Sequence, residues 1–165
     1  MKGLQPLRYA VANLHMSLQP NTYAITAVTL DRRAIFLRAE TAGLMLATLL
    51  HYRDEGRYQL HGFAIMPEHI HALITPTETQ TIERCAQCIK GGFSHALPKQ
   101  ILTQRWQPKF HHHRIRDAED FNNQLHYIAQ NPIRRHLQNW PYVHTNHIEQ
   151  LDPVPPSLIR PTAFK

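Results

Sequence analysis

The run AIMPEHIHALI, residues 64–74, decides the fold and carries the first candidate chemistry. Successive side chains of a strand point to opposite faces of a sheet. His69 and His71 therefore share one face, while the isoleucine between them points to the other. Pro67 and Glu68 separate this strand from the apolar stretch before it, and a two-residue break is typical of a hairpin. The run predicts a hairpin that holds half of a divalent-metal site on one strand.

The rest of the chain alternates between predicted strands and predicted helices. Segments rich in β-branched and apolar residues predict strands over residues 22–30, 58–66, 69–75 and 109–116. Segments with apolar residues at helical spacing predict helices over residues 38–53, 81–90 and 117–130. This order matches the α+β ferredoxin-like βαββαβ unit, an antiparallel sheet, with one added C-terminal helix that carries a tyrosine. In that fold helices cover one sheet face and leave the other open.

Glycine and proline residues are expected to mark the ends of the helices and of the domain. Gly91-Gly92 is expected to end the second helix, and Pro132 is expected to end or kink the last helix at the residue before it. Residues 1–150 are predicted to form one domain with its core at 22–137. The prolines of residues 151–165 predict an extended arm outside that core.

The charge of the chain favours a polyanionic partner. Its 165 residues carry a net charge of +6, and all of that excess falls between residues 84 and 135. A basic surface suggests nucleic acid, although a solvated face without a ligand gives the same count. The start of the chain lacks a signal-peptide core, no run has the length of a membrane span, and there are two cysteines. We therefore expect a cytoplasmic, reduced protein.

The basic residues of this region are candidate phosphate contacts. They are Arg84, Lys90, Lys99, Arg105, Lys109, Arg114, Arg116, Arg134 and Arg135.

The predicted last helix offers a second chemical group. Phe121, Leu125 and Ile128 have the spacing of a core stripe, and Tyr127 and Asn131 lie one turn apart on the adjoining flank. If this helix packs across the open sheet face, the amide of Asn131 can complete a His-His-Asn metal site. The phenol of Tyr127 would then stand beside the metal.

Such an arrangement suits phosphoryl transfer. A phenol has a reference pKa of about 10 and needs activation, which a divalent ion on the scissile phosphate supplies. Phenolate attack would give a phosphotyrosine and release a DNA 3′-hydroxyl, and the reverse reaction would rejoin strands without ATP. Two neutral nitrogens with oxygen suit Mn²⁺, and Mg²⁺ is also accepted. Gln130 is the alternative to Asn131 as third ligand, because an asparagine before a proline can also be only a helix cap.

Three segments together resemble one family. Residues 66–71, MPEHIH, resemble the His-hydrophobic-His motif of single-tyrosine HUH transposases, the IS200-like group. Residues 127–134, YIAQNPIR, resemble the tyrosine helix of that group. Residues 106–110, WQPKF, resemble a segment of its REP-associated branch. The resemblance spans roughly residues 23–137.

The resemblance implies an enzyme that nicks and rejoins single-stranded DNA near imperfect hairpins. It implies that His69, His71 and Asn131 are metal ligands and that Tyr127 is the nucleophile. Glu68 departs from the asparagine usual in the REP-associated branch. Relatives include dimers that exchange the tyrosine helix and monomers with a C-terminal tail, so we favour a monomer and leave a homodimer open.

Two competing interpretations belong to other classes of protein. An open sheet face is also typical of RRM-like proteins, which bind single-stranded nucleic acid without catalysis. Cys85 and Cys88, with His111 and His113 downstream, could outline a zinc site. We expect two free helix cysteines instead, because the chain has no second CxxC.

Overall fold

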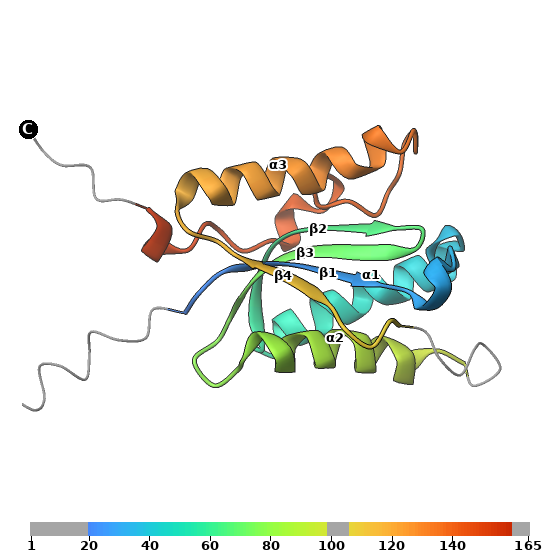
Figure 1. Ribbon diagram of the computed structural model, residues 1–165, viewed down its shortest axis with the longest axis horizontal. Helices are drawn as coiled ribbons and strands as arrows, with labels where there is room; N and C mark the ends of the chain where they lie inside the picture. The colour runs from blue at the N-terminus through green and yellow to red at the C-terminus, as the bar shows by residue number, and fades with distance from the viewer. Residues whose placement is uncertain (1–19, 99–105, 160–165) are drawn as a thin grey trace, which may run out of the picture.

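The computed structural model describes residues 20–98 and 106–159, and it confirms the predicted α+β architecture (Figure 1). Within these residues, four strands form one antiparallel sheet in the order β2-β3-β1-β4. The strands are β1 (Tyr23–Val28), β2 (Tyr58–Met66), β3 (His69–Pro76) and β4 (His111–Arg114). The helices are α1 (Ala39–Asp54), α2 (Ile82–Ala96) and α3 (Ala118–Arg134). This is the order of the ferredoxin-like unit with one added helix.

The helices divide between the two faces of the sheet. Figure 1 shows α1 and α2 on one side and α3 on the other. Alternation along β3 sorts its side chains in the same way. Ile70 and Ile74 are fully buried in the core shared with α1 and α2, while Leu73 joins the cluster beneath α3. The predicted hairpin between β2 and β3 is confirmed, and its two histidines share the α3 face.

Helix α2 runs past the glycines that were expected to end it. It continues through Gly91 and Gly92 to Ala96, so that expectation is wrong. A side chain at Gly92 would collide with the ring of Tyr52 on α1, and the glycine therefore permits close packing of the two helices. Tertiary packing overrides the weak helix propensity of glycine here.

Helix α3 begins as the sequence predicts and ends later. Asp117 is the N-cap, and its side chain accepts a hydrogen bond from the backbone N–H of Asp120. The helix does not end at Asn131, one of the two expected outcomes, because it continues through Pro132 to Arg134. A proline so near the C-terminus removes one helical hydrogen bond in the last turn, and Pro132 is buried there. None of the helices in the described ranges is long and apolar enough to cross a membrane.

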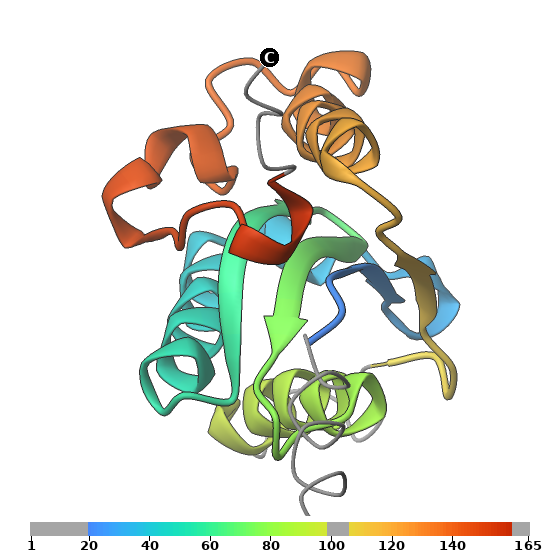
Figure 2. The same cartoon turned by 90° about the vertical axis from the view of Figure 1, so that its left-hand side faces the viewer.

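Residues 140–159 return along the β2 side of the sheet (Figure 2). The backbone N–H of Ile65 donates to the carbonyl of Tyr142, and Asp152 and Leu60 exchange backbone and side-chain hydrogen bonds. Val154 and Leu158 pack against the cluster beneath α3. The expectation of an arm outside the core is therefore wrong for residues 151–159, while the division of the chain after residue 150 stays a prediction.

Asp152 fastens this segment, and we expect Asp152→Ala to lower the free energy of unfolding by about 2 kcal/mol at neutral pH. Its carboxylate accepts two hydrogen bonds from Arg53, both 2.9 Å, and one from Leu60 N–H at 2.8 Å. Burial alone would raise the pKa of Asp152, but these bonds and the Arg53 charge lower it. The stabilisation is present above the unfolded pKa of about 3.9 and is lost as the pH falls through the folded value.

Urea unfolding of the parent and Asp152→Ala from neutral pH to about pH 2 measures this effect. Glu149→Gln is the matched control, because Glu149 is an exposed carboxylate of the same segment. If Asp152→Ala lowers the free energy of unfolding as much in acid as at neutral pH, the stabilisation does not come from the ionised Asp152 carboxylate.

Candidate active site

The two histidines of β3 direct one nitrogen each at a common point. Nε2 of His69 lies 3.1 Å from Nε2 of His71, and the rings meet edge to face. The other ring nitrogens are engaged. Nδ1 of His69 donates to Glu68 at 3.1 Å, and Nδ1 of His71 shares a 2.8 Å hydrogen bond with the hydroxyl of Thr26. A partner on Nδ1 fixes the ring and leaves Nε2 available as a ligand.

Both imidazoles are held in the neutral form that binds metals. Burial, together with a smaller effect of the neighbouring His69, lowers the pKa of His71 to about 4. Burial also lowers the pKa of His69, and the charges of Arg135 and Arg32 act in the same direction against the opposing effect of Glu68. At neutral pH each imidazole therefore has one unprotonated ring nitrogen that can bind a metal.

The separation of these nitrogens fits two neighbouring ligands of one ion. Adjacent ligands of an octahedral ion at about 2.1 Å lie about 3.0 Å apart, close to the 3.1 Å observed. Across residues 20–98 and 106–159, no group of three or more His, Cys, Asp or Glu side chains is arranged to hold a metal. In these ranges a third protein ligand would therefore be an amide, a hydroxyl or a backbone carbonyl.

Tyr127 lies beside the histidine pair. Its ring meets the ring of His71 edge to face, with centroids 5.8 Å apart. The residue is 42 % exposed, so the phenol is open to a substrate. The guanidinium of Arg134 stands 5.1 Å from the Tyr127 ring centroid and brings a positive charge to it. Helix α3 therefore packs across the sheet face, as it must for Tyr127 to stand beside the histidines.

Asn131 lies one turn further along α3 and is 9 % exposed. Its Nδ2 donates to the carbonyl of Tyr127 at 2.9 Å. Within the described part of the chain, Oδ1 has no hydrogen-bond partner. A buried amide oxygen without a partner suits a ligand of a hard cation. Its assignment as the third ligand, with half-buried Gln130 as the alternative, stays a prediction.

The candidate phosphate contacts near α3 fall at both of its ends. Arg134 and Arg135 lie at the C-terminal end, beside the histidines. Arg114 and Arg116 lie at the other end, where Arg116 forms an ion pair with Asp120. Two of these four arginines, Arg134 and Arg135, therefore lie close to the candidate active site.

The remaining candidates lie elsewhere. Arg84 and Lys90 are on α2, on the opposite side of the sheet from α3. Nζ of Lys90 donates to the carbonyl of Gln107 at 2.7 Å, and burial lowers its pKa. Lys109 precedes β4, and Lys99 and Arg105 fall outside the described residues.

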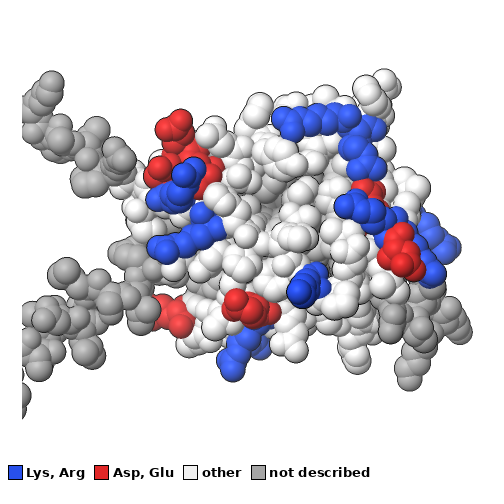
Figure 3. All heavy atoms as spheres, viewed as in Figure 1, with Lys and Arg blue, Asp and Glu red and all other residues white. Residues whose placement is uncertain are grey.

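Sequence reasoning missed two contributors to the site. Thr26 reaches His71 because β1 pairs with β3 in the register that sets these residues opposite one another. The same register pairs Val28 with His69, and the short turn η1 (Leu30–Arg32) follows β1 directly. Arg32 is therefore near enough for its charge to lower the pKa of His69. Figure 3 shows Lys and Arg side chains gathered at this end of the molecule, from the end of α3 down to η1.

The zinc interpretation is wrong, and the expectation of free cysteines is confirmed. Cys85 is buried and Cys88 half-buried, both free, and no metal cluster forms within the described ranges. His113 instead pairs with Asp120. Trp106, from the motif before β4, donates its ring N–H to the carbonyl of Lys90 and packs against the core.

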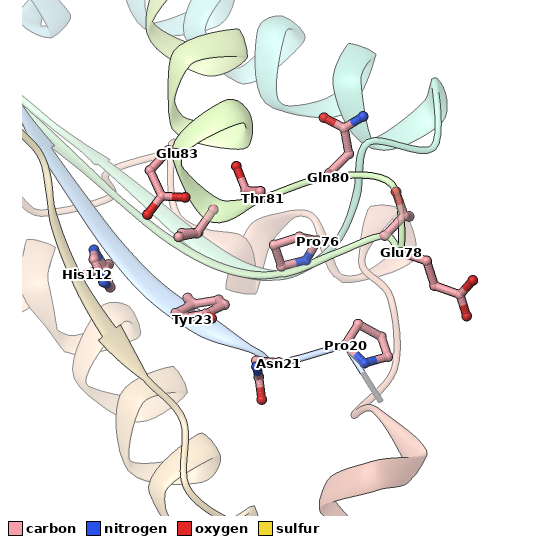
Figure 4. Close-up of a pocket in the computed structure, with 11 residues that line it drawn as sticks. Pro20, Asn21, Tyr23, Pro76, Glu78, Gln80, Thr81, Glu83 and His112 are labelled. Carbon is pink, nitrogen blue, oxygen red and sulfur yellow. The ribbon is translucent and has the colours of Figure 1, made fainter. Parts of the chain in front are cut away.

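A separate cavity of about 390 Å³ lies between the start of α2 and the strands β1 and β4 (Figure 4). Tyr23 and His112 form part of its wall. Among the residues that the structure describes, its charged lining residues are the carboxylates Glu78 and Glu83, with no lysine or arginine. The cavity therefore does not suit a phosphate.

Comparison with known proteins gives one consistent family. The family model described as "Transposase IS200 like" matches residues 18–131. The chain is 27% identical over 130 residues to the REP-associated tyrosine transposase of Escherichia coli K12, covering 76% of each chain. It is 30% identical over 139 residues to a Haemophilus influenzae protein described under the same name, covering 73% of this chain and 77% of that one.

A solved structure has the same fold. It is described as a REP-associated tyrosine transposase bound to a REP hairpin. The TM-score is 0.67, over 84% of this chain and 86% of that chain, at 23% sequence identity.

Proposed function

The chain belongs to the IS200-like transposase family, whose members cleave and transfer DNA strands, and we propose that it nicks and rejoins single-stranded DNA beside hairpins through a 5′-phosphotyrosine on Tyr127. The observation that carries this proposal is the contact between the rings of Tyr127 and His71. It joins a nucleophile from α3 to a ligand pair from β3. The two groups lie 56 positions apart in the sequence and meet only through the fold.

Tyr127 is the attacking group in this proposal. The phenol gives up its proton to water as its oxygen forms a bond to the phosphorus, the bond from phosphorus to the 3′ oxygen breaks, and that oxygen takes up a proton to become the 3′-hydroxyl. The 5′ side of the break stays attached to Tyr127 as a phosphodiester. A 3′-hydroxyl can therefore attack the same phosphorus and reseal a strand without ATP. The guanidinium of Arg134 stands over the ring and adds a positive charge beside the attacking group.

His69 and His71, with Asn131, would hold the divalent ion. Members of this family generally require a metal, and we propose Mg²⁺ or Mn²⁺. When bound, such an ion polarises the scissile phosphate and offsets its developing charge. The protein's part is to keep both imidazoles neutral, which burial achieves, and to hold their rings through Glu68 and Thr26 so that the two Nε2 atoms face a common point.

Hairpin DNA is the proposed substrate, because the relatives are REP-associated transposases and a protein of the same fold is described with a REP hairpin. The cation-rich end of the molecule lies beside Tyr127 and supports a path for the phosphate backbone there. Tyr127 reaches His71 of its own chain, which supports a monomer as the active unit. We place the enzyme in the cytoplasm, where its DNA substrate is.

The interpretation as an RRM-like binder is wrong for this chain. Such proteins bind nucleic acid on an open sheet face. Here Phe121 and Ile128 of α3 are buried on that face. The family relatives are enzymes as well.

We expect Tyr127→Phe to abolish the covalent protein–DNA adduct while hairpin binding stays within about threefold of the parent, since a missing hydroxyl removes the nucleophile and little contact area. Labelled single-stranded hairpin DNA with Mn²⁺, resolved on a denaturing gel, measures the adduct, and a mobility shift measures binding. Tyr23→Phe is the matched control, because Tyr23 packs on the opposite sheet face and should form adduct normally. An adduct formed by Tyr127→Phe refutes the proposal.

The third ligand has its own test. We expect Asn131→Ala to weaken Mn²⁺ binding by about tenfold or more, as loss of a ligand should, and Gln130→Ala to change it by less than about twofold. Titration calorimetry on the DNA-free protein measures both constants. The opposite ranking would assign the third ligand to Gln130 and refute Asn131.

A further inference from the structure

The carboxylate of Glu68 lies in the turn between β2 and β3 and is buried, with the residue 6 % exposed. One of its oxygens, Oε1, has two donors. Nη1 of Arg135 lies 2.7 Å away and Nδ1 of His69 lies 3.1 Å away. Nη2 of Arg135 is 3.4 Å from the second oxygen. A single side chain therefore joins a metal-site histidine to the residue that follows α3.

The turn that carries this carboxylate is fixed. The backbone carbonyl of Glu68 accepts hydrogen bonds from the N–H and the hydroxyl of Thr29, at 2.9 and 2.8 Å. The carbonyl of Pro67 accepts from the N–H of Phe36 at 3.0 Å. Because β1 and the following turn hold the hairpin in this way, Glu68 is an anchor and not a mobile surface group.

Arg135 is the C-cap residue of α3, and its backbone N–H donates to the carbonyls of Asn131 and Ile133. It lies about two turns beyond Tyr127. The other end of α3 is fastened by Asp120, which pairs with His113 of β4 at 2.9 Å. Besides the buried contact of Ile128, the pair of Arg135 with Glu68 therefore ties the half of the helix that carries Tyr127 and Asn131 to the hairpin.

We propose that Glu68 is a positioning residue that sets the ring of His69 and anchors the C-terminal end of α3 through Arg135, so that the metal ligands and the tyrosine stay aligned. The proposal rests on the proposed function. It explains why a buried carboxylate occupies the turn directly before the first histidine. Burial would raise the pKa of Glu68, but the hydrogen bond from Arg135 and the charge of that guanidinium lower it.

Neighbouring side chains supply matched controls. The hydroxyl of Thr26 fixes the ring of His71 through a 2.8 Å hydrogen bond, and this bond involves no residue of α3. Arg134 has the same charge as Arg135 and lies next to it, but it stands over Tyr127 and forms no ion pair with Glu68. Variants at these positions remove a hydroxyl or a charge nearby and leave the Glu68 bridge in place.

Hydrogen exchange of residues 127–135 in the metal-free, DNA-free full chain is the first readout. We expect Glu68→Ala and Arg135→Gln each to speed exchange about tenfold or more, because a charge-assisted hydrogen bond is lost. Arg134→Gln and Thr26→Val should stay within about twofold of the parent, since neither touches the anchor. Unchanged exchange in Arg135→Gln overturns the anchoring role, even where Glu68→Ala does not fold, because Arg135 is half exposed and its loss leaves the core intact.

The ring of His69 gives the second readout, by ¹⁵N NMR of the same samples. We expect the parent, Arg135→Gln and Glu68→Gln to keep the proton on Nδ1, because each retains an oxygen acceptor at this position. Glu68→Ala should lose this preference. A proton that stays fixed on Nδ1 in Glu68→Ala, or leaves it in Glu68→Gln, overturns the orienting role.

Cleavage of hairpin DNA at saturating Mn²⁺ completes the test. We expect Arg135→Gln to lower the single-turnover rate about tenfold or more with Mn²⁺ affinity within about threefold of the parent, and Glu68→Ala to impair both. An unmodified chain that cleaves no hairpin DNA would count against the proposed function alone. The exchange and ¹⁵N results would still decide whether Glu68 bridges His69 and α3.

Discussion

The packing of α3 across the sheet is the constraint on which the site depends. Phe121 and Ile128 are each 1 % exposed, and Leu125 fills the space that a side chain at Gly62 would otherwise take. Burying an apolar side chain of this size contributes about 1.5–3 kcal/mol. Because Tyr127 adjoins this stripe on the helix, the contacts that stabilise α3 also bring the phenol to the histidines.

Local patterns were enough to predict most of this arrangement. Alternation along residues 69–75 placed both histidines on one face, and the helical spacing of the α3 stripe placed the tyrosine on its flank. Asp117 marked the start of α3 by a side-chain bond that its own sequence neighbourhood determines. The fold class then followed from the order of the elements.

The features that were missed depend on residues far apart in the sequence. Gly91-Gly92 and Pro132 have weak helix propensity, but they lie in helices that tertiary packing keeps intact. The bonds of Thr26 to His71 and of Glu68 to Arg135 arise from strand register and from where α3 ends. The basic excess of residues 84–135 is likewise spread over both sides of the sheet, so a count along the chain does not locate a surface.

The central claim is that the tyrosine and the metal-binding histidines form one site within one chain. Addition of substoichiometric Mn²⁺ to protein with ¹³C-labelled tyrosine rings tests it most directly, because the paramagnetic ion broadens nearby signals first. The ring of Tyr127 should broaden well before that of Tyr58, which pairs with Pro76 at the far end of β3 from the histidines. Equal broadening of the two, or earlier loss of Tyr58, would contradict the claim.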